Sequence, residues 1–345
     1  MSQESLHGLT MGDHILNIKN RGRQRGGLLV ALLPLVLGLP WAVGGAEMIS
    51  LHTLSRTPGF QPLTTRADQA VLATRSQRLQ LYKDSRRAIF DGVTIWLNAP
   101  VEKSWGRWQI ARADVTHTVQ PLFNPASALA AKGHTVVVLD AGHGGKDQGA
   151  SLPGGKLIEK ELTLELAQAV RDILRRQQVD VRLTRSADRQ LALAERSRLA
   201  GAWRAAVFIS IHFNAAANAQ AAGIETHILA PSGCSITAQP AARGADAQAC
   251  LGNRHDGANM VLGYLMQKSL LKYTRAEDRG VRRSRFMVLR NSPCPAALIE
   301  CGFLSHPAEQ KKIMSAAYRR DMARGIAEGI LSYLRAVQRA RAAQP

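Results

Sequence analysis

The sequence predicts an α/β fold: a three-layer architecture with a largely parallel or mixed sheet and helices on both faces, preceded by a small β-rich N-terminal unit. From His134 onward, continuously apolar segments of strand length alternate with longer segments whose apolar residues recur at helical spacing. Strands without polar alternation are typical of a sheet buried on both faces. The 345 residues, 46% of them hydrophobic, suffice for one good-sized domain and an appendage.

The first 46 residues have the pattern of an export signal. A leader containing Lys19 and Arg25 precedes the apolar run from Leu28 to Val43, and small residues up to Ala46 follow it. A basic leader and a short, proline-broken apolar segment are typical of a cleaved signal, whereas a membrane span needs about 20 apolar residues. We therefore expect cleavage near Ala46 and a mature chain that is exported to the periplasm or cell envelope. An uncleaved anchor is the alternative.

The strongly basic composition predicts an anionic partner. Forty-five Lys and Arg residues stand against 26 Asp and Glu residues, a formal charge of +19, and most of the basic residues follow the leader. Nucleic acid, a membrane surface or an acidic polymer would all suit this charge. Aromatic residues make up only 5% of the chain and do not interleave with basic ones as single-strand nucleic-acid platforms require. No nucleic acid is expected, and membrane contact is expected only through the N-terminal segment or the basic surface.

The region before the α/β pattern divides into two parts. Residues 47–86 are polar, basic and rich in turn formers, and we expect a linker with room for one helix. Residues 87–130 contain β-branched and aromatic runs up to Pro121, which predict the small β-rich unit and a second linker. An almost equally supported alternative is that these strands extend the main sheet.

The C-terminal region, residues 131–340, is expected to be the main domain. Strands are predicted over residues 134–140, 179–184, 205–212, 223–230, 285–289 and 296–300. Helices are predicted over residues 160–178, 191–203, 258–273 and 307–338. Residues 231–256, which are rich in glycine and proline, are predicted to form a loop insertion.

The glycine-rich stretch "TVVVLDAGHGGKDQGA" follows the first of these strands and could serve either a phosphate or a metal. A phosphate-binding loop would need glycine where Asp140 stands and Ser or Thr where Asp147 stands. The dinucleotide-binding pattern also fails, because Asp147 replaces its third glycine. The stretch therefore favours the delivery of His143 to a metal.

Four residues form the candidate site. His143, His212 and Glu300 lie at or just past the carboxyl ends of apolar strands, and Glu159 stands at the start of the first long helix. An α/β sheet gathers its ligands at this edge. Two imidazoles and a carboxylate are a normal catalytic zinc set, and the remaining carboxylate can act as the base. Each residue also has a structural interpretation alone, such as a dipole-stabilised carboxylate for Glu159.

The polar residues near these four have less specific roles: one has two possible interpretations, and three are predicted to be structural. Asp140 either orients a histidine or is merely a strand-end turn former, and Arg185, Asp188 and Arg196 are predicted to form a structural ion network. The basic stretch 279–285 is predicted to be a solvated face. Among the four cysteines, we favour a disulfide between Cys234 and Cys250, which would close a ring in the loop insertion.

Five ordered blocks of the sequence resemble the zinc-dependent N-acetylmuramoyl-L-alanine amidases of the Amidase_3 family. They are "VVVLDAGHGGKDQGA", "IEKELTLELA", "TRSADRQLALAERSRLA", "FISIHFNAA" and "DRGVRRSRFMVLRNSPCPAALIECGFLSH", within about residues 134–336. The resemblance implies a cell-envelope enzyme that cuts peptidoglycan between the lactyl group of N-acetylmuramic acid and the L-alanine of the stem peptide. It further implies that His143, Glu159 and His212 bind Zn²⁺ and that Glu300 is the catalytic glutamate.

The chain departs from the family pattern at Ala141, Phe213 and His306, where proline, alanine and asparagine are common. None of these replaces a ligand, although Phe213 could alter the floor of the cleft. Some relatives carry a regulatory helix at the position of the insertion 231–256, but its glycines and prolines argue against one long helix, and autoinhibition is left open. An activator protein stays open. A zinc peptidase that cuts within the stem, or a non-catalytic cell-wall-binding protein, is the alternative.

Overall fold

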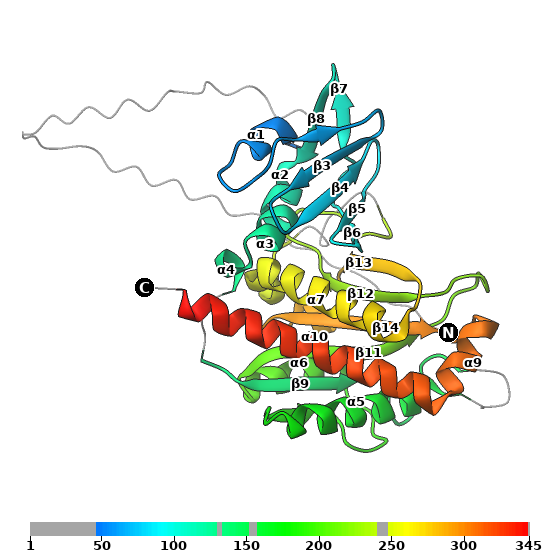
Figure 1. The fold of residues 1–345 in the computed structure, drawn as a ribbon. Helices are drawn as coiled ribbons and strands as arrows, with labels where there is room; N and C mark the ends of the chain where they lie inside the picture. The colour runs from blue at the N-terminus through cyan, green and yellow to red at the C-terminus, as the bar shows by residue number, and fades with distance from the viewer. Residues whose placement is uncertain (1–45, 130–132, 152–156, 240–247, 344–345) are drawn as a thin grey trace, which may run out of the picture. The chain divides into compact units, whose positions relative to one another are not determined.

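The computed structural model describes residues 46–129, 133–151, 157–239 and 248–343, which belong to one compact unit (Figure 1). The predicted export signal lies outside these residues except for Ala46. Within the described residues, no helix is both long enough and apolar enough to cross a membrane.

A mixed sheet of eleven strands runs in the order β10-β9-β11-β14-β12-β13-β6-β5-β4-β3-β2. Strands β10, β9, β11 and β14 are parallel, whereas β12 is antiparallel to β14 and parallel to β13. The strands of the C-terminal region are β9 (Val136–Ala141), β10 (Val181–Leu183), β11 (Ala205–Asn214), β12 (Ile224–Leu229), β13 (Asp278–Ser284) and β14 (Ala296–Phe303). The parallel core brings the carboxyl ends of β9, β11 and β14 to one edge, as a ligand site in an α/β sheet requires.

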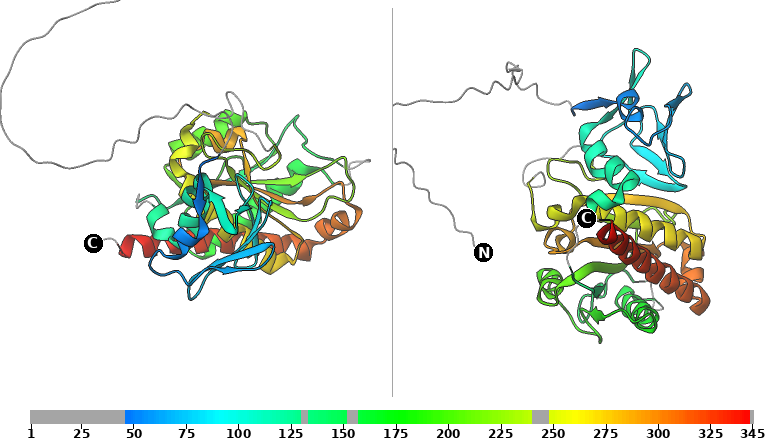
Figure 2. Two further views of the ribbon diagram at one scale, coloured as in Figure 1. Left: turned by 90° about the horizontal axis from the view of Figure 1, so that it is seen from above. Right: turned by 60° about the vertical axis from the view of Figure 1, so that its left-hand side comes forward.

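Helices cover both faces of this sheet, which confirms the predicted three-layer α/β class. Helices α5 (Glu159–Arg176), α7 (Asp256–Thr274) and α10 (Ala316–Ala342) pack on one face, and α10 lies against both α5 and α7 (Figure 2). Helix α6 (Leu193–Ala202) and the short α8 (Met287–Arg290) pack on the other. Helix α9 (Pro307–Met314) precedes α10.

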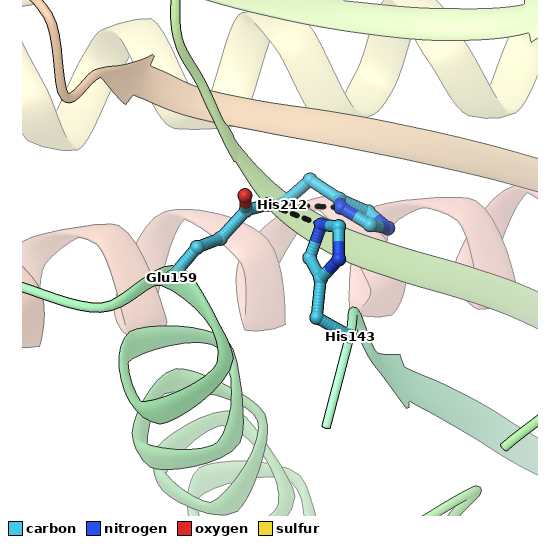
Figure 3. A group of neighbouring side chains, drawn as sticks. All are labelled: His143, Glu159 and His212. Atoms are coloured by element: carbon cyan, nitrogen blue, oxygen red, sulfur yellow. Dashed lines mark hydrogen bonds and ion pairs between the residues drawn. The ribbon is translucent and has the colours of Figure 1, made fainter. Parts of the chain in front are cut away.

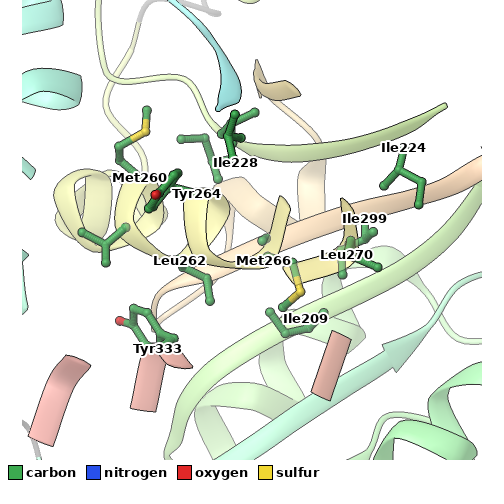
Figure 4. Close-up of a cluster of buried hydrophobic side chains, with 14 of the residues drawn as sticks. Ile209, Ile224, Ile228, Met260, Leu262, Tyr264, Met266, Leu270, Ile299 and Tyr333 are labelled. Carbon is green, nitrogen blue, oxygen red and sulfur yellow. The ribbon is translucent and has the colours of Figure 1, made fainter. Parts of the chain in front are cut away.

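Helix α7 is buried almost all round because it lies between the sheet and α10. Its residues Met260, Leu262 and Met266 contact a core that includes Ile228 of β12 and Tyr333 of α10 (Figure 4). A helix that is apolar on every side is expected in such an interior position. This core fixes β12 and β14 in place beside the candidate site.

The prediction of a linker over residues 47–86 is wrong. The segment forms β1 (Met48–Ser50), α1 (Leu51–Ser55), β2 (Thr64–Thr65), β3 (Gln69–Ala73) and β4 (Arg78–Tyr82). The strands are short, and in β4 the buried Leu79 and Leu81 alternate with polar residues, so one solvated face gave the segment its polar composition. Antiparallel strands of this kind bury only one face.

The predicted small β-rich N-terminal unit is present, and the alternative that its strands extend the main sheet is also confirmed. Strand β6 (Val93–Trp96) pairs with β13 through Ile95 and Val281, and β5 (Arg87–Phe90) continues the sheet beyond it. A second, three-stranded sheet contains β1, β7 (Glu102–Ser104) and β8 (Arg107–Ala111). Short helical turns then lead toward the main domain: α2 (Arg112–Asp114), the π-helix η1 (Val115–Val119), α3 (Gln120–Phe123) and α4 (Pro125–Ala128).

Three further predictions for the C-terminal region are corrected. The predicted strand 285–289 is mostly the short helix α8, and the strand precedes it as β13 over the basic stretch Asp278–Ser284. The arginines of this strand hid its β pattern in the sequence. Arg283 was predicted to be solvated but is buried.

The cysteines are all free, so the Cys234–Cys250 disulfide is not formed. The Cys250 thiol instead donates a hydrogen bond to Asn253 Oδ1. Outside residues 240–247, the insertion contains the 3₁₀-helix η4 (Leu251–His255) and ends at Asp256, the first residue of α7.

Candidate metal centre

The structure brings His143, Glu159 and His212 together from three separate elements (Figure 3). Their ligand atoms all lie within 4.8 Å of one another. Glu159 Oε1 is 3.1 Å from His143 Nε2 and 3.0 Å from His212 Nδ1, and the two imidazole rings meet edge to face with centroids 4.9 Å apart. Two nitrogen atoms and one oxygen atom converging in this way match the three protein ligands of a catalytic zinc site.

His143 projects from the glycine-rich turn after β9 and has a left-handed backbone, with φ of 58°. Asp147 Oδ1 accepts a hydrogen bond from His143 Nδ1 at 2.8 Å. This bond places the proton on Nδ1 and leaves Nε2, which faces Glu159, able to bind a metal ion. Burial alone would lower the pKa of His143, but Glu159 and Asp147 together raise it. This role of Asp147 was not predicted, although a carboxylate four residues after a turn histidine is a sequence signal for it.

Two buried arginines hold the backbone of this turn. Arg185 Nε donates to Ala141 O at 2.9 Å, and Arg196 Nη2 donates to His143 O at 2.8 Å. Asp188 fixes the same turn from outside by accepting from Gly145 N at 2.7 Å. The predicted structural role of these residues is therefore confirmed, although, among the described residues, Arg185 donates to carbonyl and hydroxyl oxygens and only Arg196 and Asp188 form ion pairs, with Asp140 and Lys160.

Asp140 does not orient a histidine. Its carboxylate accepts hydrogen bonds from Thr184 Oγ1 at 2.6 Å, Ser210 Oγ at 2.7 Å and Arg196 Nη1 at 2.8 Å, and it is fully buried. These bonds tie β9 to β11 and to α6 underneath the site. Of the two interpretations, the orienting role is wrong, and the residue is a buried structural anchor rather than a simple turn former.

The glycines of the turn make room for the site's own side chains. A Cβ atom on Gly142 would lie 2.3 Å from His212 Cε1, and one on Gly149 would lie 2.5 Å from Glu159 Oε2. Such distances are impossible for a Cβ atom without a shift of the ring or carboxylate. The glycine-rich composition thus serves close approach of the backbone to His212 and Glu159, not a phosphate.

Glu159 is the first residue of α5, where the helix dipole favours a carboxylate. Its Oε2 atom accepts from Ala150 N at 2.8 Å, and its Oε1 atom accepts from Phe213 N at 3.0 Å. Burial alone would raise the pKa of Glu159, but hydrogen bonds with His143 and His212 lower it to about 2. The carboxylate is therefore ionised at neutral pH, as a metal ligand must be.

Glu300 lies beside the three ligands but outside their group. It pairs in register with His212 of β11 on one side and with Glu225 of β12 on the other. Its Oε2 atom is buried and has no hydrogen-bond partner among the described residues. Burial first, and then the charges of Glu159 and Glu225, raise the pKa of Glu300 well above its ordinary value. A carboxyl group in this state can hold a proton at neutral pH.

Two residues that depart from the family pattern, Phe213 and His306, have structural roles. The Phe213 side chain is buried in the hydrophobic core, so it does not form the floor of the cleft, and only its backbone N–H reaches the site. His306 caps α9, because its Nδ1 atom accepts from Glu309 N at 3.3 Å. Asparagine is also a favoured N-cap residue, so the two residue types can do the same work here.

A cavity of about 1030 Å³ lies elsewhere in the molecule. It is lined by Thr135 and Ala205, at or before the amino ends of β9 and β11, and by Asp256 at the start of α7. None of the three ligands lines it. The candidate metal-binding group therefore lies at the opposite ends of the strands from this cavity.

Comparisons with known proteins agree on one family. The model of the family Amidase_3, N-acetylmuramoyl-L-alanine amidase, matches residues 137–332. The chain is 32% identical to N-acetylmuramoyl-L-alanine amidase AmiA of Escherichia coli over 58% of this chain and 76% of that protein, and 34% identical to CwlM of Bacillus licheniformis over 56% and 66%. A solved N-acetylmuramoyl-L-alanine amidase from Clostridium difficile 630 is similar to 59% of this chain and 98% of that chain, with 34% identity and a TM-score of 0.50.

Proposed function

Because the chain belongs to the Amidase_3 family of N-acetylmuramoyl-L-alanine amidases, we propose that it hydrolyses the amide between the lactyl group of N-acetylmuramic acid and the L-alanine of the peptidoglycan stem. The observation that carries this proposal is the convergence of His143, Glu159 and His212 within 4.8 Å. Glu300 stands next to them in register on β14. Three ligands with an adjacent carboxylate support metal-assisted hydrolysis.

The donor set fits a zinc ion held by His143 Nε2, His212 Nδ1 and a Glu159 oxygen. The fit rests on the Asp147 hydrogen bond, which selects the His143 tautomer, and on the ionised state of Glu159. When bound there, zinc would supply Lewis-acid polarisation of the scissile carbonyl and acidify a water molecule. Soft thiolates are not involved, since all four cysteines lie outside this group.

Glu300 is proposed as the general acid and base. It would take a proton from the attacking water at its carboxylate and pass that proton to the nitrogen of the departing alanine. The environment that raises the pKa of Glu300 suits this second step, because it allows the carboxyl group to carry the proton. Glu225, its neighbour in register, adds negative charge that strengthens this tendency.

Digestion of purified peptidoglycan by the zinc-loaded mature chain, analysed by mass spectrometry, tests the proposal. We expect intact stem peptides and peptide-free glycan, and we expect neither product in the presence of a chelator. Shortened stems would instead establish a peptidase, and binding without products would establish a wall-binding protein.

Two variants separate the proposed roles of base and ligand. Glu300→Ala should retain bound zinc and lose turnover by about 10²–10⁴-fold, the range typical of general acid–base catalysis. His143→Ala should lose the metal as well as the activity. Atomic absorption of the purified variants reports metal content, and full zinc occupancy in His143→Ala would remove that residue from the ligand set.

Export is a separate proposal. It is supported by the basic leader and short apolar run before Glu47 and by relatives named as cell wall amidases. N-terminal sequencing of the protein recovered from the cell envelope should find a start close to residue 47. An intact N-terminus in the membrane fraction would show the anchored alternative.

A further inference from the structure

A cationic cluster lies beside Glu300 that the proposed proton transfers do not use. Arg279 and Arg282 of β13 both form ion pairs with Glu225 of β12, the residue in register with Glu300. Arg282 Nε lies 3.5 Å from Glu225 Oε2, and Arg279 Nε pairs with Oε1. The two arginines therefore lie on β13, one strand beyond Glu225, which flanks Glu300.

A β-bulge allows both arginines to reach the same carboxylate. The register of β12 with β13 shifts between Ile224, which pairs with Asp278, and Glu225, which pairs with Gly280. Arg279 is consequently an extra residue in β13, and Gly280 has a φ of 86°. Bulges of this kind re-aim side chains and are frequent next to active sites.

Aromatic rings hold both guanidinium groups. Arg282 lies over the Trp96 ring at 5.4 Å, and Arg279 lies over the Phe303 ring at 4.8 Å. The Trp96 indole also donates to Arg279 O at 2.9 Å. The side chains keep 28% exposure for Arg279 and 19% for Arg282, so both guanidinium groups are preorganised and still reach solvent.

The cluster has an excess of positive charge. It contains two guanidinium groups and the single carboxylate of Glu225. The remaining titratable member is His227, whose Nε2 atom donates to Glu225 Oε2 at 2.9 Å and whose Nδ1 atom accepts from Ser284 Oγ at 2.8 Å. Burial lowers the pKa of His227, despite the opposing effect of Glu225, so it is neutral at pH 7. One positive charge is left for a ligand.

We propose that Arg279 and Arg282 bind a free carboxylate on the second residue of the stem peptide and thereby set substrate specificity. This proposal rests on the proposed amidase function. Strands β14, β12 and β13 are consecutive, so the cluster is about 10 Å from Glu300 at a strand spacing of about 4.8 Å. An extended peptide covers about 3.5 Å per residue, so two residues span about 7 Å, and the long side chain of Arg279, which reaches back over Phe303 of β14, covers the remaining distance. Arginine suits a planar carboxylate because its guanidinium group can donate two parallel hydrogen bonds.

A pair of muramoyl tripeptides tests the proposal with the zinc-loaded full chain. One contains L-Ala-γ-D-Glu-L-Lys, in which the α-carboxylate of D-Glu is free. The other contains L-Ala-γ-D-isoGln-L-Lys, in which this α-carboxylate alone is replaced by an amide. We expect the wild type to prefer the carboxylate substrate in kcat/KM by about 10-fold or more, through KM, as a charge-assisted hydrogen bond of about 1.5–3 kcal/mol implies. Equal kcat/KM values for the two substrates would overturn the proposal.

Variants assign that preference to the cluster. Arg282→Gln should bring the preference close to 1, and Arg282→Lys, which keeps the charge but loses the bidentate geometry, should give an intermediate value. Arg182→Gln is the matched control, because Arg182 also lies over a tryptophan, Trp203, at 5.7 Å, but on the edge strand β10. A preference that survives in Arg282→Gln, or that falls equally in Arg182→Gln, would reject the assignment.

Binding of the free tripeptides by calorimetry keeps this proposal separate from the amidase proposal. Tighter binding of the carboxylate form, lost in Arg282→Gln, would support the subsite even if no amide were cleaved, and the amidase proposal alone would then fail. Cleavage of both substrates with neither kinetic nor binding preference would reject the subsite and leave the amidase proposal intact.

Discussion

At the residue scale, the same type of side chain takes opposite ionisation tendencies within one site. Glu159 is held ionised by two histidines, whereas Glu300 has no hydrogen-bond partner at Oε2 among the described residues and faces two other carboxylates. Such divergence is what the proposed roles of metal ligand for Glu159 and proton carrier for Glu300 require. It follows from neighbours that are distant in sequence.

Glu300 should make the metal-free protein less stable as pH rises. Its pKa in the folded state is raised above the ordinary value of 4.5, so its contribution to stability is full below pH 4.5 and is lost as pH rises through the folded-state pKa. In chelator, Glu300→Gln should therefore exceed the wild type in unfolding free energy at pH 8 by about 1–3 kcal/mol, with little difference at pH 4. Urea unfolding at the two pH values measures this, with the exposed Glu161→Gln as control. A difference independent of pH would contradict the raised pKa.

Asp147 should control metal affinity without being a ligand. Asp147→Asn removes the charge that fixes His143 Nδ1 while it preserves the shape of the side chain. The zinc dissociation constant should rise about 10–100-fold, as is usual when a partner of a ligand histidine is lost. Competition with a chelating dye measures the constant. Asp172→Asn, an exposed change on α5, should leave it unaltered, and an unaltered constant in Asp147→Asn would refute the role.

At the element scale, the site depends on how a strand end, a turn and a helix start are joined. The turn after β9 packs so closely on β11 that Gly142 faces the His212 ring directly. Arg185 and Arg196 add side-chain hydrogen bonds to the backbone carbonyls of Ala141 and His143. The glycine-rich turn after β9 is therefore held in place by hydrogen bonds from these two buried arginines.

Gly142→Ala should displace His212. The added Cβ atom would meet the imidazole at 2.3 Å, so the ring must move away from the ligand position. Overpacking of this kind typically costs about 1–3 kcal/mol, and we expect reduced zinc occupancy together with a lower melting temperature. Gly133→Ala is the control, because nothing lies within 4 Å of its added Cβ atom. Full zinc binding in Gly142→Ala would show that the turn can move to accommodate the added Cβ atom without displacing His212, and would contradict the prediction.

At the scale of the whole molecule, the N-terminal strands are part of the main sheet. Thr94 N donates to Asp278 Oδ2 at 2.7 Å, and Arg283 Nη2 donates to Thr118 Oγ1 at 2.8 Å across the same junction. Arg283 is itself buried. Polar contacts of this kind link the strands before residue 130 to the region that carries the site.

We expect a single unfolding transition, because the N-terminal strands and the C-terminal region are joined in one sheet. Because β6 and β13 share one sheet, residues 47–343 should unfold cooperatively in thermal scans followed by circular dichroism and by tryptophan fluorescence. Trp96→Ala should lower the midpoint, since the indole stacks on Arg282 and bonds to Arg279 O. Two separate transitions would contradict the continuous sheet, whereas an exposed change such as Trp105→Ala should leave the midpoint in place.

The sequence by itself determined the α/β class, the four candidate residues and the glycine-rich turn. Apolar continuity and helical spacing are local patterns, and parallel strands must bring their carboxyl ends to one edge. Only the tertiary structure decided the rest: that residues 47–86 form strands, that the 285–289 segment is largely helical, and that Asp147 rather than Asp140 orients His143. The bulge at Arg279 and the aromatic support from Trp96 likewise depend on contacts between distant segments. Strand partners, bulges and the neighbours that shift a pKa are set by long-range packing, which no local pattern records.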